Sequence, residues 1–400
     1  MRNFRPTEYA LFRIGASIAT AALVWALGCG ATGHMPTAPL TLSFVNSSNP
    51  GTSPQPVSVT AFDLNGDGIL DLVAPADGGL NVFLGRGDGT FVPAPTISMP
   101  QINNVAAADF NGDGIPDLAL SLPDVNQVEV LLGNGDGTFS SLSPISSDSV
   151  AFVQAPGDLN GDGNADLVVI APGADAITIL LGNGDGTFPT EQMISVSGGP
   201  QSLAVGDFDR DGKTDLAVVS VFSQTMTVLM GNGDGTFTAK VQHPATGHIP
   251  VSATVGDFNG DGILDLVVAN LNSGAPSLGS LTVMLGNGDG TFRPTPSSPV
   301  LGSCPGSIAS ADFNQDGHRD IVATSSYEGT TSVLLGNGDG TFDAPLSFPS
   351  GAGSLFAAVG DYNGDGVPDL AVAAGNANRV TVLLAKLTPG VAVRASDVHQ

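Results

Sequence analysis

The sequence predicts an all-β fold, a seven-bladed β-propeller with four-stranded blades, and three observations predict it. A nine-residue acidic loop occurs seven times, a Gly-Asp-Gly-Thr-Phe segment occurs six times, and the stretches between them are short apolar runs without helical periodicity. The acidic loops start at residues 63, 109, 158, 207, 257, 312 and 361, so the repeat is 46 to 55 residues long. A repeat of that length with four strand-length runs is typical of a propeller blade.

The acidic loops follow the pattern Asp-x-Asn-x-Asp-Gly-x-x-Asp, with Asp209 in place of the asparagine in the fourth copy. Oxygen-bearing side chains at positions 1, 3, 5 and 9 and a glycine at position 6 are what Ca²⁺ requires from a short segment. Without a cation the carboxylates would repel one another, so we expect up to seven Ca²⁺ ions rather than metal-free turns. The expected side-chain ligands are, at position 1, Asp63, Asp109, Asp158, Asp207, Asp257, Asp312 and Asp361; at position 3, Asn65, Asn111, Asn160, Asp209, Asn259, Asn314 and Asn363; at position 5, Asp67, Asp113, Asp162, Asp211, Asp261, Asp316 and Asp365; and at position 9, Asp71, Asp117, Asp166, Asp215, Asp265, Asp320 and Asp369.

An EF-hand loop begins in a similar way but requires an acidic residue at position 12. That position is apolar in every copy: Ala74, Leu120, Val169, Val218, Val268, Ala323 and Val372. The helix-loop-helix interpretation is therefore excluded. Because the loops recur in every repeat and lack a spare catalytic partner, we expect Ca²⁺ to stabilise the fold rather than take part in a reaction.

The charge of the chain argues against some classes of partner. The formal net charge is -26, with 38 acidic residues against 12 lysines and arginines. A nucleic acid, or an anionic membrane held by basic patches, is therefore disfavoured. Seven Ca²⁺ ions would bring the net charge to about -12 and relieve much of the repulsion within a compact fold.

The N-terminal residues have the pattern of an export signal. Arg2, Arg5 and Arg13 precede an apolar run over residues 14–27, which is too short for a spanning helix and is typical of a secretory signal. The run leads into Gly28-Cys29, which resembles the lipobox of bacterial lipoproteins, although Leu27 is less usual there than a small residue. We predict a lipoprotein-type signal peptide over residues 1–28, lipidation of Cys29, and a location in the bacterial cell envelope; an ordinary signal cleaved nearby, with secretion, is the alternative.

With Cys29 lipidated, Cys304 is the remaining thiol, so an internal disulfide is excluded and Ca²⁺ is the expected substitute in an exported protein. The predicted mature chain has a flexible linker over residues 29–38, one propeller over residues 39–387 and a flexible tail over residues 388–400. We expect a monomer.

The repeated turns indicate how the ring closes. Asn-Gly and Asp-Gly between alternating strands favour tight hairpins, and the phenylalanine that follows, such as Phe188, is expected to pack between blades. The Gly-Asp-Gly-Thr-Phe turn is absent after the last third strand, residues 380–384, whereas an extra strand-like segment, residues 40–44, precedes the first loop. If these two segments pair, all seven blades have four strands and the ring has no long open edge.

With the acidic loops recurring in register, the chain resembles the FG-GAP/VCBS repeat family, whose best-known members are the seven-bladed propellers of integrin α subunits. The resemblance implies that each loop joins the innermost strand of a blade to the second strand. It also implies that the main-chain carbonyl at position 7 binds the metal. Those residues are Ile69, Ile115, Asn164, Lys213, Ile263, His318 and Val367. The chain departs from strict repeats at Asp209 and at Gln315, His318 and Arg319.

Candidate catalytic groups are sparse. No Gly-x-Ser-x-Gly motif occurs, and His243 and His248 have no nearby acid or cysteine with which to form a zinc site. We therefore predict a non-enzymatic module for binding or adhesion to a protein or polysaccharide at the cell surface, with no catalytic residues. One alternative is a calcium-dependent carbohydrate lyase or hydrolase, and another is a structural component of envelope assembly.

The predicted blade places the acidic loops and the hairpin turns on one face, so the less regular connections form the other face. A ligand site would differ among blades there. We expect ligand contacts from Phe222, His248, Tyr327 and Arg379. The extra length between the fifth and sixth loops makes that sector the favoured location.

Overall fold

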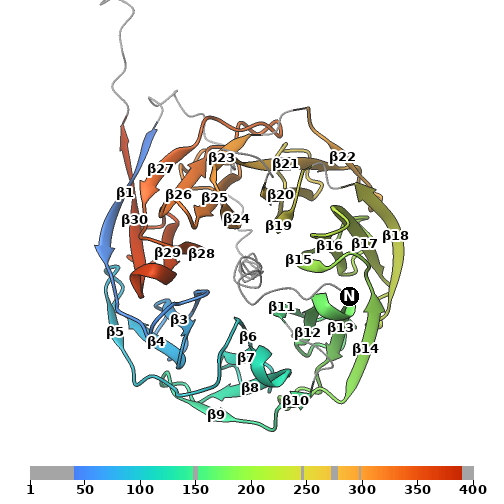
Figure 1. Ribbon diagram of the computed structural model, residues 1–400, viewed down its shortest axis with the longest axis horizontal. Helices are drawn as coiled ribbons and strands as arrows, with labels where there is room; N and C mark the ends of the chain where they lie inside the picture. Colours follow the sequence, from blue (N-terminus) through green and yellow to red (C-terminus); the bar gives the residue numbers. More distant parts are fainter. Residues whose placement is uncertain (1–39, 147–151, 245–246, 272–277, 297–298, 390–400) are drawn as a thin grey trace, which may run out of the picture.

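In the computed structural model, seven antiparallel sheets stand around a central axis like the blades of a propeller (Figure 1). The structure describes residues 40–146, 152–244, 247–271, 278–296 and 299–389. Within these ranges no helix is long and apolar enough to span a membrane. The predicted all-β fold, with seven blades and an N-terminal strand that closes the ring, is confirmed.

Blades 1 to 6 take their strands in chain order from the centre outward, whereas in blade 7 the outermost strand is β1 (Leu40–Ser48). Blade 1 comprises β2 (Thr60–Phe62), β3 (Asp71–Ala76), β4 (Gly79–Gly85) and β5 (Phe91–Pro93); blade 2, β6 (Asn104–Ala108), β7 (Asp117–Leu122), β8 (Gln127–Gly133), β9 (Phe139–Ser141) and β10 (Ile145–Ser146); and blade 3, β11 (Phe152–Gly157), β12 (Asp166–Ala171), β13 (Ala176–Leu181) and β14 (Thr190–Ser195).

Blade 4 comprises β15 (Pro200–Gly206), β16 (Asp215–Ser220), β17 (Thr225–Gly231) and β18 (Phe237–Pro244); blade 5, β19 (Pro250–Gly256), β20 (Asp265–Leu271), β21 (Leu278–Gly286), β22 (Phe292–Pro294) and β23 (Val300–Ser303); blade 6, β24 (Pro305–Ala311), β25 (Asp320–Ser325), β26 (Thr330–Leu334) and β27 (Leu346–Pro349); and blade 7, β28 (Ser354–Gly360), β29 (Asp369–Ala374), β30 (Arg379–Pro389) and β1 (Leu40–Ser48). In blades 2 and 5 two short strands share the outer position, since β9 and β10 both pair with β8, and β22 and β23 both pair with β21.

Ring closure occurs between the two predicted segments, but in a different register. We expected residues 40–44 to lie opposite residues 380–384; instead Leu40 lies opposite Pro389, Phe44 opposite Ala385 and Val45 opposite Leu384. In the other blades a hairpin turn ties the outer strand to the third strand and sets its register. No turn joins β1 to β30, so the longer strand β30 is free to pair beyond the predicted segment.

The hydrophobic core is divided into seven clusters among the described residues, one at each interface between neighbouring blades. A recurrent aromatic contact marks these interfaces. Phe188, which follows the hairpin turn of blade 3, packs edge-on against Phe110 of the second acidic loop, with ring centroids 5.6 Å apart. Phe292 and Phe208 repeat the contact between blades 5 and 4 at 5.3 Å. The expectation that these phenylalanines pack between blades is confirmed.

Hydroxyl groups link the innermost strands around part of the ring. Ser202 of blade 4 accepts a hydrogen bond from the Ala253 N–H of blade 5 at 3.2 Å. Ser252 accepts from the Ile308 N–H of blade 6 at 3.3 Å, and the same contact recurs at the next interface. These serines are buried, so the bonds satisfy main-chain donors that would otherwise be unpaired beside the central axis.

Candidate functional site

Each acidic loop folds around its first aspartate. In loop 1, Asp63 Oδ1 accepts hydrogen bonds from the Gly66 and Asp67 N–H groups at 2.8 and 3.1 Å, and Oδ2 accepts from the Gly68 N–H at 2.8 Å. Asn65 donates from Nδ2 to Asp67 Oδ2 at 3.0 Å. The loop sequence therefore draws the oxygen atoms at positions 1, 3 and 5 toward one another.

The aspartate at position 9 joins the loop to the rest of its blade. Asp71 is fully buried; its Oδ2 accepts from the Leu64 N–H at 2.9 Å and its Oδ1 from the Gly85 N–H at 2.7 Å. Gly85 ends the third strand, and a Cβ there would lie 2.3 Å from the Leu70 carbonyl oxygen, so glycine is needed for this approach. The same pair of bonds forms in every blade, with the Ala385 N–H as the second donor to Asp369.

Burial raises the pKa of all seven position-9 carboxyl groups, and the other aspartates of the same loop raise it further, whereas the two main-chain hydrogen bonds lower it. The pKa of Asp265 and of Asp320 reaches about 6, and that of Asp369 about 7. A buried carboxylate beside two or three others lacks compensating positive charge, which a divalent cation would supply.

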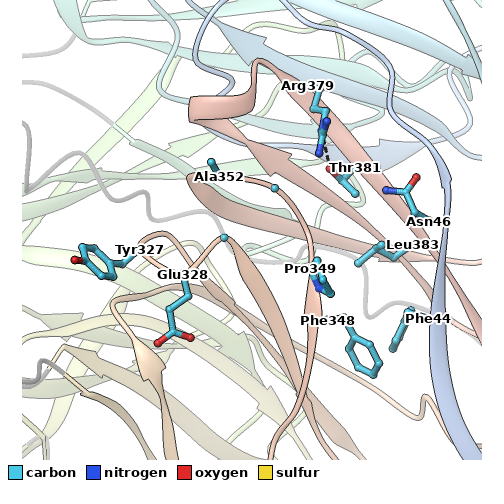
Figure 2. A pocket seen from close by; sticks show the side chains of 12 residues that line it. Phe44, Asn46, Tyr327, Glu328, Phe348, Pro349, Ala352, Arg379, Thr381 and Leu383 are labelled. Carbon is cyan, nitrogen blue, oxygen red and sulfur yellow. Dashed lines mark hydrogen bonds between the residues drawn. The ribbon is translucent and has the colours of Figure 1, made fainter.

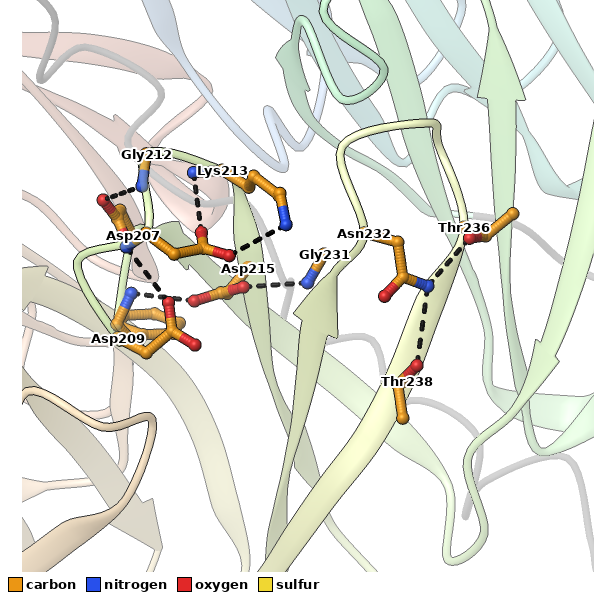
Figure 3. Close-up of polar contacts among 11 residues, drawn as sticks. Asp207, Asp209, Gly212, Lys213, Asp215, Gly231, Asn232, Thr236 and Thr238 are labelled. Atoms are coloured by element: carbon orange, nitrogen blue, oxygen red, sulfur yellow. Dashed lines mark hydrogen bonds and ion pairs between the residues drawn. The ribbon is translucent and has the colours of Figure 1, made fainter.

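The fourth loop shows the donor set most clearly because its third position is also an aspartate. Carboxylate oxygens of Asp207, Asp209 and Asp215 lie within 4.8 Å of one another (Figure 3). Lys213 at position 7 forms an ion pair with Asp211 at 3.0 Å rather than with these three carboxylates. All the available donors are hard oxygen atoms, so the loop suits Ca²⁺ better than a metal that prefers nitrogen or sulfur ligands.

The acidic loops and the hairpin turns lie on the same face of the ring, as expected. The side chain at position 7 covers the turn of its own blade: a Cβ added to Gly135 would lie 3.2 Å from Ile115 Cδ1, and one added to Gly87 would lie 3.3 Å from Ile69 Cδ1. Each turn also reaches the neighbouring blade, where the Gly186 N–H donates to the Phe110 carbonyl at 2.9 Å.

Two loops depart from the others at position 4, which is glycine elsewhere. Arg210 and Gln315 occupy it with φ angles of 64° and 58°. Arg210 Nη2 donates to the Gly262 carbonyl at 3.3 Å, and Gln315 Nε2 donates to the Gly366 carbonyl at 2.9 Å. Gly262 and Gly366 are both at position 6, so each long side chain connects position 4 of its loop to position 6 of the next loop. The departure at residue 315 is visible in the sequence, whereas this contact is not.

On the opposite face, the structure brings together two of the four expected ligand residues. Tyr327, in the turn between β25 and β26, and Arg379, at the start of β30, line one cleft. Phe222 lies in the corresponding turn of blade 4 and packs against Gly199, and the exposed His248 lies between blades 4 and 5. The favoured sector between the fifth and sixth loops includes residues 272–277, which lie outside the described residues.

The cleft has a volume of about 460 Å³ and lies between blades 6 and 7 (Figure 2). Phe44 of β1 and Phe348 of β27 form its lower end in the figure, with ring centroids 4.9 Å apart. Arg379 and Thr381 lie at the upper end, and Tyr327 with Glu328 lies across from them. Phe44, Phe348 and Glu328 were not among the expected ligand residues. Phe44 reaches this cleft only because β1 closes the ring beside blade 6.

The export signal, Cys29 and the linker lie outside the described residues, as do residues 390–400 of the predicted tail. Strand β30 continues to Pro389, two residues beyond the predicted end of the propeller.

Solved structures with a similar fold include BBS1N, crystallised in complex with ARL6DN. It shares 14% sequence identity with a TM-score of 0.60, and the match covers 87% of this chain and 98% of that one. An Agrocybe aegerita lectin, described as recognising non-reducing terminal N-acetylglucosamine, shares 19% identity with a TM-score of 0.51, covering 84% and 86%. A Lactobacillus plantarum protein shares 14% identity with a TM-score of 0.54, covering 75% and 86%. No curated protein matches the chain.

A family model described as the FG-GAP-like repeat matches residues 63–120, 109–157, 158–218, 215–268, 268–323 and 312–372. These six matches extend over the acidic loops of all seven blades and over more than half of the chain. The chain therefore belongs to the FG-GAP-like repeat family.

Proposed function

We propose that this protein is a non-enzymatic, calcium-stabilised β-propeller that binds a protein or a polysaccharide. The difference between its two faces carries the proposal. One face is made of nearly identical acidic loops and hairpin turns, whereas the other is made of connections that differ from blade to blade. The latter face exposes large aromatic side chains, with Tyr327 82% and Phe222 67% exposed. Irregular connections with exposed aromatic residues on a rigid scaffold favour a binding surface.

Calcium is proposed for the regular face. In each loop the side-chain oxygens of positions 1, 3, 5 and 9 and the carbonyl of position 7 would hold the ion. Support comes from the cluster of Asp207, Asp209 and Asp215 and from the buried position-9 carboxylates. When bound, Ca²⁺ would neutralise these charges and connect the first and second strands of each blade.

Two proteins of similar fold bind different kinds of partner, namely ARL6DN in the case of BBS1N and terminal N-acetylglucosamine in the case of the lectin. Both kinds of partner are therefore kept in the proposal, because a similar fold at low identity does not select one of them. The closed ring, which leaves no unpaired strand between the first and last blades, favours a monomer.

We place the protein outside the cytoplasm, in the bacterial cell envelope through a lipid on Cys29, or secreted if the signal is of the ordinary type. The arginines and the apolar run of residues 2–27 support export. Fractionation of cells that express Cys29→Ser should show release from the membrane. Unchanged membrane retention of that variant would refute the lipid anchor.

The binding function is tested by retention of the purified propeller on a panel of immobilised polysaccharides in the presence of Ca²⁺. Soluble sugar release is recorded in the same wells. Retention without release supports a binding module, and release would make the protein an enzyme. Retention on no polysaccharide would direct the search to a protein partner, by affinity capture with the purified chain and identification of a single stoichiometric protein.

A further inference from the structure

The cleft between blades 6 and 7 contains a guanidinium group held in place by its surroundings. Arg379 Nε donates to Thr381 Oγ1 at 3.3 Å, and Thr381 is buried. A Cβ added to Gly351 would lie 3.5 Å from Arg379 Nη2, so the guanidinium extends over the main chain of the connection between β27 and β28. The side chain is half-buried and therefore loses little freedom when it binds a ligand.

This guanidinium has no carboxylate partner in the part of the chain that the structure describes, where the ion pair formed is that of Lys213 with Asp211. The other described arginines also lack a carboxylate partner, but they are exposed, whereas Arg379 is half-buried in the cleft. A planar guanidinium with free donors in a cleft is suited to a carboxylate, to which it donates two parallel hydrogen bonds.

The remainder of the cleft combines aromatic rings with a few polar groups. The half-buried rings of Phe44 and Phe348 supply an apolar surface, and the exposed ring of Tyr327 lies at the rim. Asn46, whose amide is hydrogen-bonded to Asn49, and Glu328, whose carboxylate lies toward Gly302, also line the cleft and add polar groups to it. Aromatic surface with a few placed polar groups, in a volume of about 460 Å³, suits a small ligand or one segment of a longer chain.

The lining favours a sugar over an acidic protein segment. Among the described residues that line the cleft, Tyr327 is the large apolar side chain that is strongly exposed. A protein interface normally buries about 800 Å² on each side around several apolar anchors, which this rim does not present. A saccharide needs less area, and its hydroxyl groups match the polar lining.

We propose that the cleft between blades 6 and 7 binds an acidic oligosaccharide that contains a uronic acid residue. Arg379 binds the sugar carboxylate, and Tyr327 packs against a sugar ring. The proposal rests on the proposed binding function, since it names the site and the ligand class for one of the two partner types.

The test is calorimetric titration of the purified propeller, in excess Ca²⁺, with three uronate oligosaccharides that contain glucuronate, galacturonate or mannuronate. The carboxyl-reduced form of each serves as the neutral control. We expect at least one uronate oligosaccharide to bind and its reduced form to bind about tenfold more weakly or not at all. Arg379→Gln should reduce the affinity for the uronate form by about tenfold. Binding to the reduced form should hardly change.

Matched variants separate the site from general charge effects. Arg293→Gln removes the same charge from an exposed position on β22 and should leave the affinity unchanged. Tyr327→Ala should weaken binding several-fold, whereas Met193→Ala, which removes an exposed apolar side chain from the outer strand of blade 3, should not. Tyr327 is strongly exposed, so its substitution leaves the fold intact, and the melting temperature of each variant verifies this.

Equal affinity for the charged and reduced sugars, or equal effects of Arg379→Gln and Arg293→Gln, would overturn the proposal. Binding of an acidic peptide in the cleft with no binding of uronates would overturn it as well. Retention of another polysaccharide or of a protein, unaffected by Arg379→Gln, would refute the cleft assignment and leave the proposed binding function standing. If the propeller is retained on no polysaccharide and captures no protein partner, both the cleft assignment and the proposed binding function are refuted.

Discussion

Phe44 of β1 packs edge-on against Phe313 of the sixth acidic loop, with ring centroids 6.0 Å apart and ring planes at 69°. Phe188 makes the same kind of contact with Phe110, but it directly follows the hairpin turn of its own blade. Phe44 comes from the opposite end of the propeller sequence. It therefore replaces, in blade 7, the phenylalanine that the missing hairpin turn would have supplied.

This contact predicts that closure of the ring depends on Phe44. Phe44→Ala removes the ring from its contacts with Phe313 and Phe348, and we expect it to lower the free energy of unfolding by about 2 kcal/mol, since the ring is half-buried rather than fully buried. Urea denaturation measures the change. Val45→Ala, at an exposed neighbour in the same strand, is the control and should cost less than about 0.5 kcal/mol. Equal losses for the two variants would contradict the proposed role of the aromatic contact.

Calcium removal should destabilise the propeller. A ligand present at about 100 times its dissociation constant stabilises the folded state by about 2.7 kcal/mol per independent site. We therefore expect EDTA to lower the melting temperature and added Ca²⁺ to restore it. Mg²⁺ should restore it less well because it requires stricter octahedral geometry. Identical melting curves in Ca²⁺ and EDTA would refute the calcium proposal.

The stoichiometry of Ca²⁺ binding provides a separate prediction for a single loop. Asp257→Asn removes the position-1 carboxylate of the fifth loop, around which three main-chain N–H groups converge. We expect it to weaken one site and reduce the number of tightly bound Ca²⁺ ions by one, as measured by calorimetry. Asp289→Asn alters the hairpin turn of the same blade, where Asp289 contacts Thr291, and should leave the count unchanged. A reduced count for the control variant would contradict the assignment of the ligands.

The hairpin turns predict a specific dependence on pH. The Thr138 hydroxyl and N–H donate to Asp136 Oδ1 at 2.5 and 2.9 Å, and these bonds lower the pKa of Asp136 from its ordinary value of 3.8. Because the folded-state pKa is the lower one, the turn contributes stability above pH 3.8, and that contribution is lost as the pH falls through the folded-state pKa. Side-chain carbonyl signals in a ¹³C NMR titration report this pKa directly.

Thr138→Val removes the hydroxyl donor and should return the pKa of Asp136 toward 3.8, whereas Thr138→Ser retains the donor and should keep the pKa low. If valine and serine give the same titration curve, the hydroxyl is not the cause of the shift.

The parts of the fold that repeat could be predicted from sequence, because each repeat carries its own turn and loop signals. The register of β1 could not. The apolar alternation of β1 is short, at Leu40, Leu42 and Phe44, while β30 has 11 residues, and no turn between the two strands selects one pairing. The position-9 aspartates were expected to be ligands from the sequence. Their bonds to the N–H groups at the end of the third strand, such as that of Gly85, depend on how the acidic loop and the hairpin turn of a blade meet.

The cleft was predicted only in part for a related reason. Tyr327 and Arg379 were expected on the irregular face from their type and their place between strands. Their proximity to Phe44 and Phe348 follows from three-dimensional closure, which joins residues separated by most of the chain. The sector between the fifth and sixth acidic loops was favoured because of its extra length. Length shows where additional residues lie but not where side chains come together.

The main chain and the side chain of Arg210 have opposing effects on stability. Its φ of 64° is unfavourable for a residue with a Cβ, and its side chain compensates through the bond to the Gly262 carbonyl. Arg210→Gly relieves the strain and loses the bond, so we expect little net change in the free energy of unfolding. Arg210→Ala loses the bond and keeps the strain, and should be less stable than the glycine variant by about 1 kcal/mol. Urea denaturation in excess Ca²⁺ compares the two variants, and Gly66→Ala, at the same position of the first loop, should show a similar cost relative to the native glycine. An alanine variant as stable as the glycine variant would mean that the loop relaxes at this position and that the left-handed conformation is not imposed by the fold.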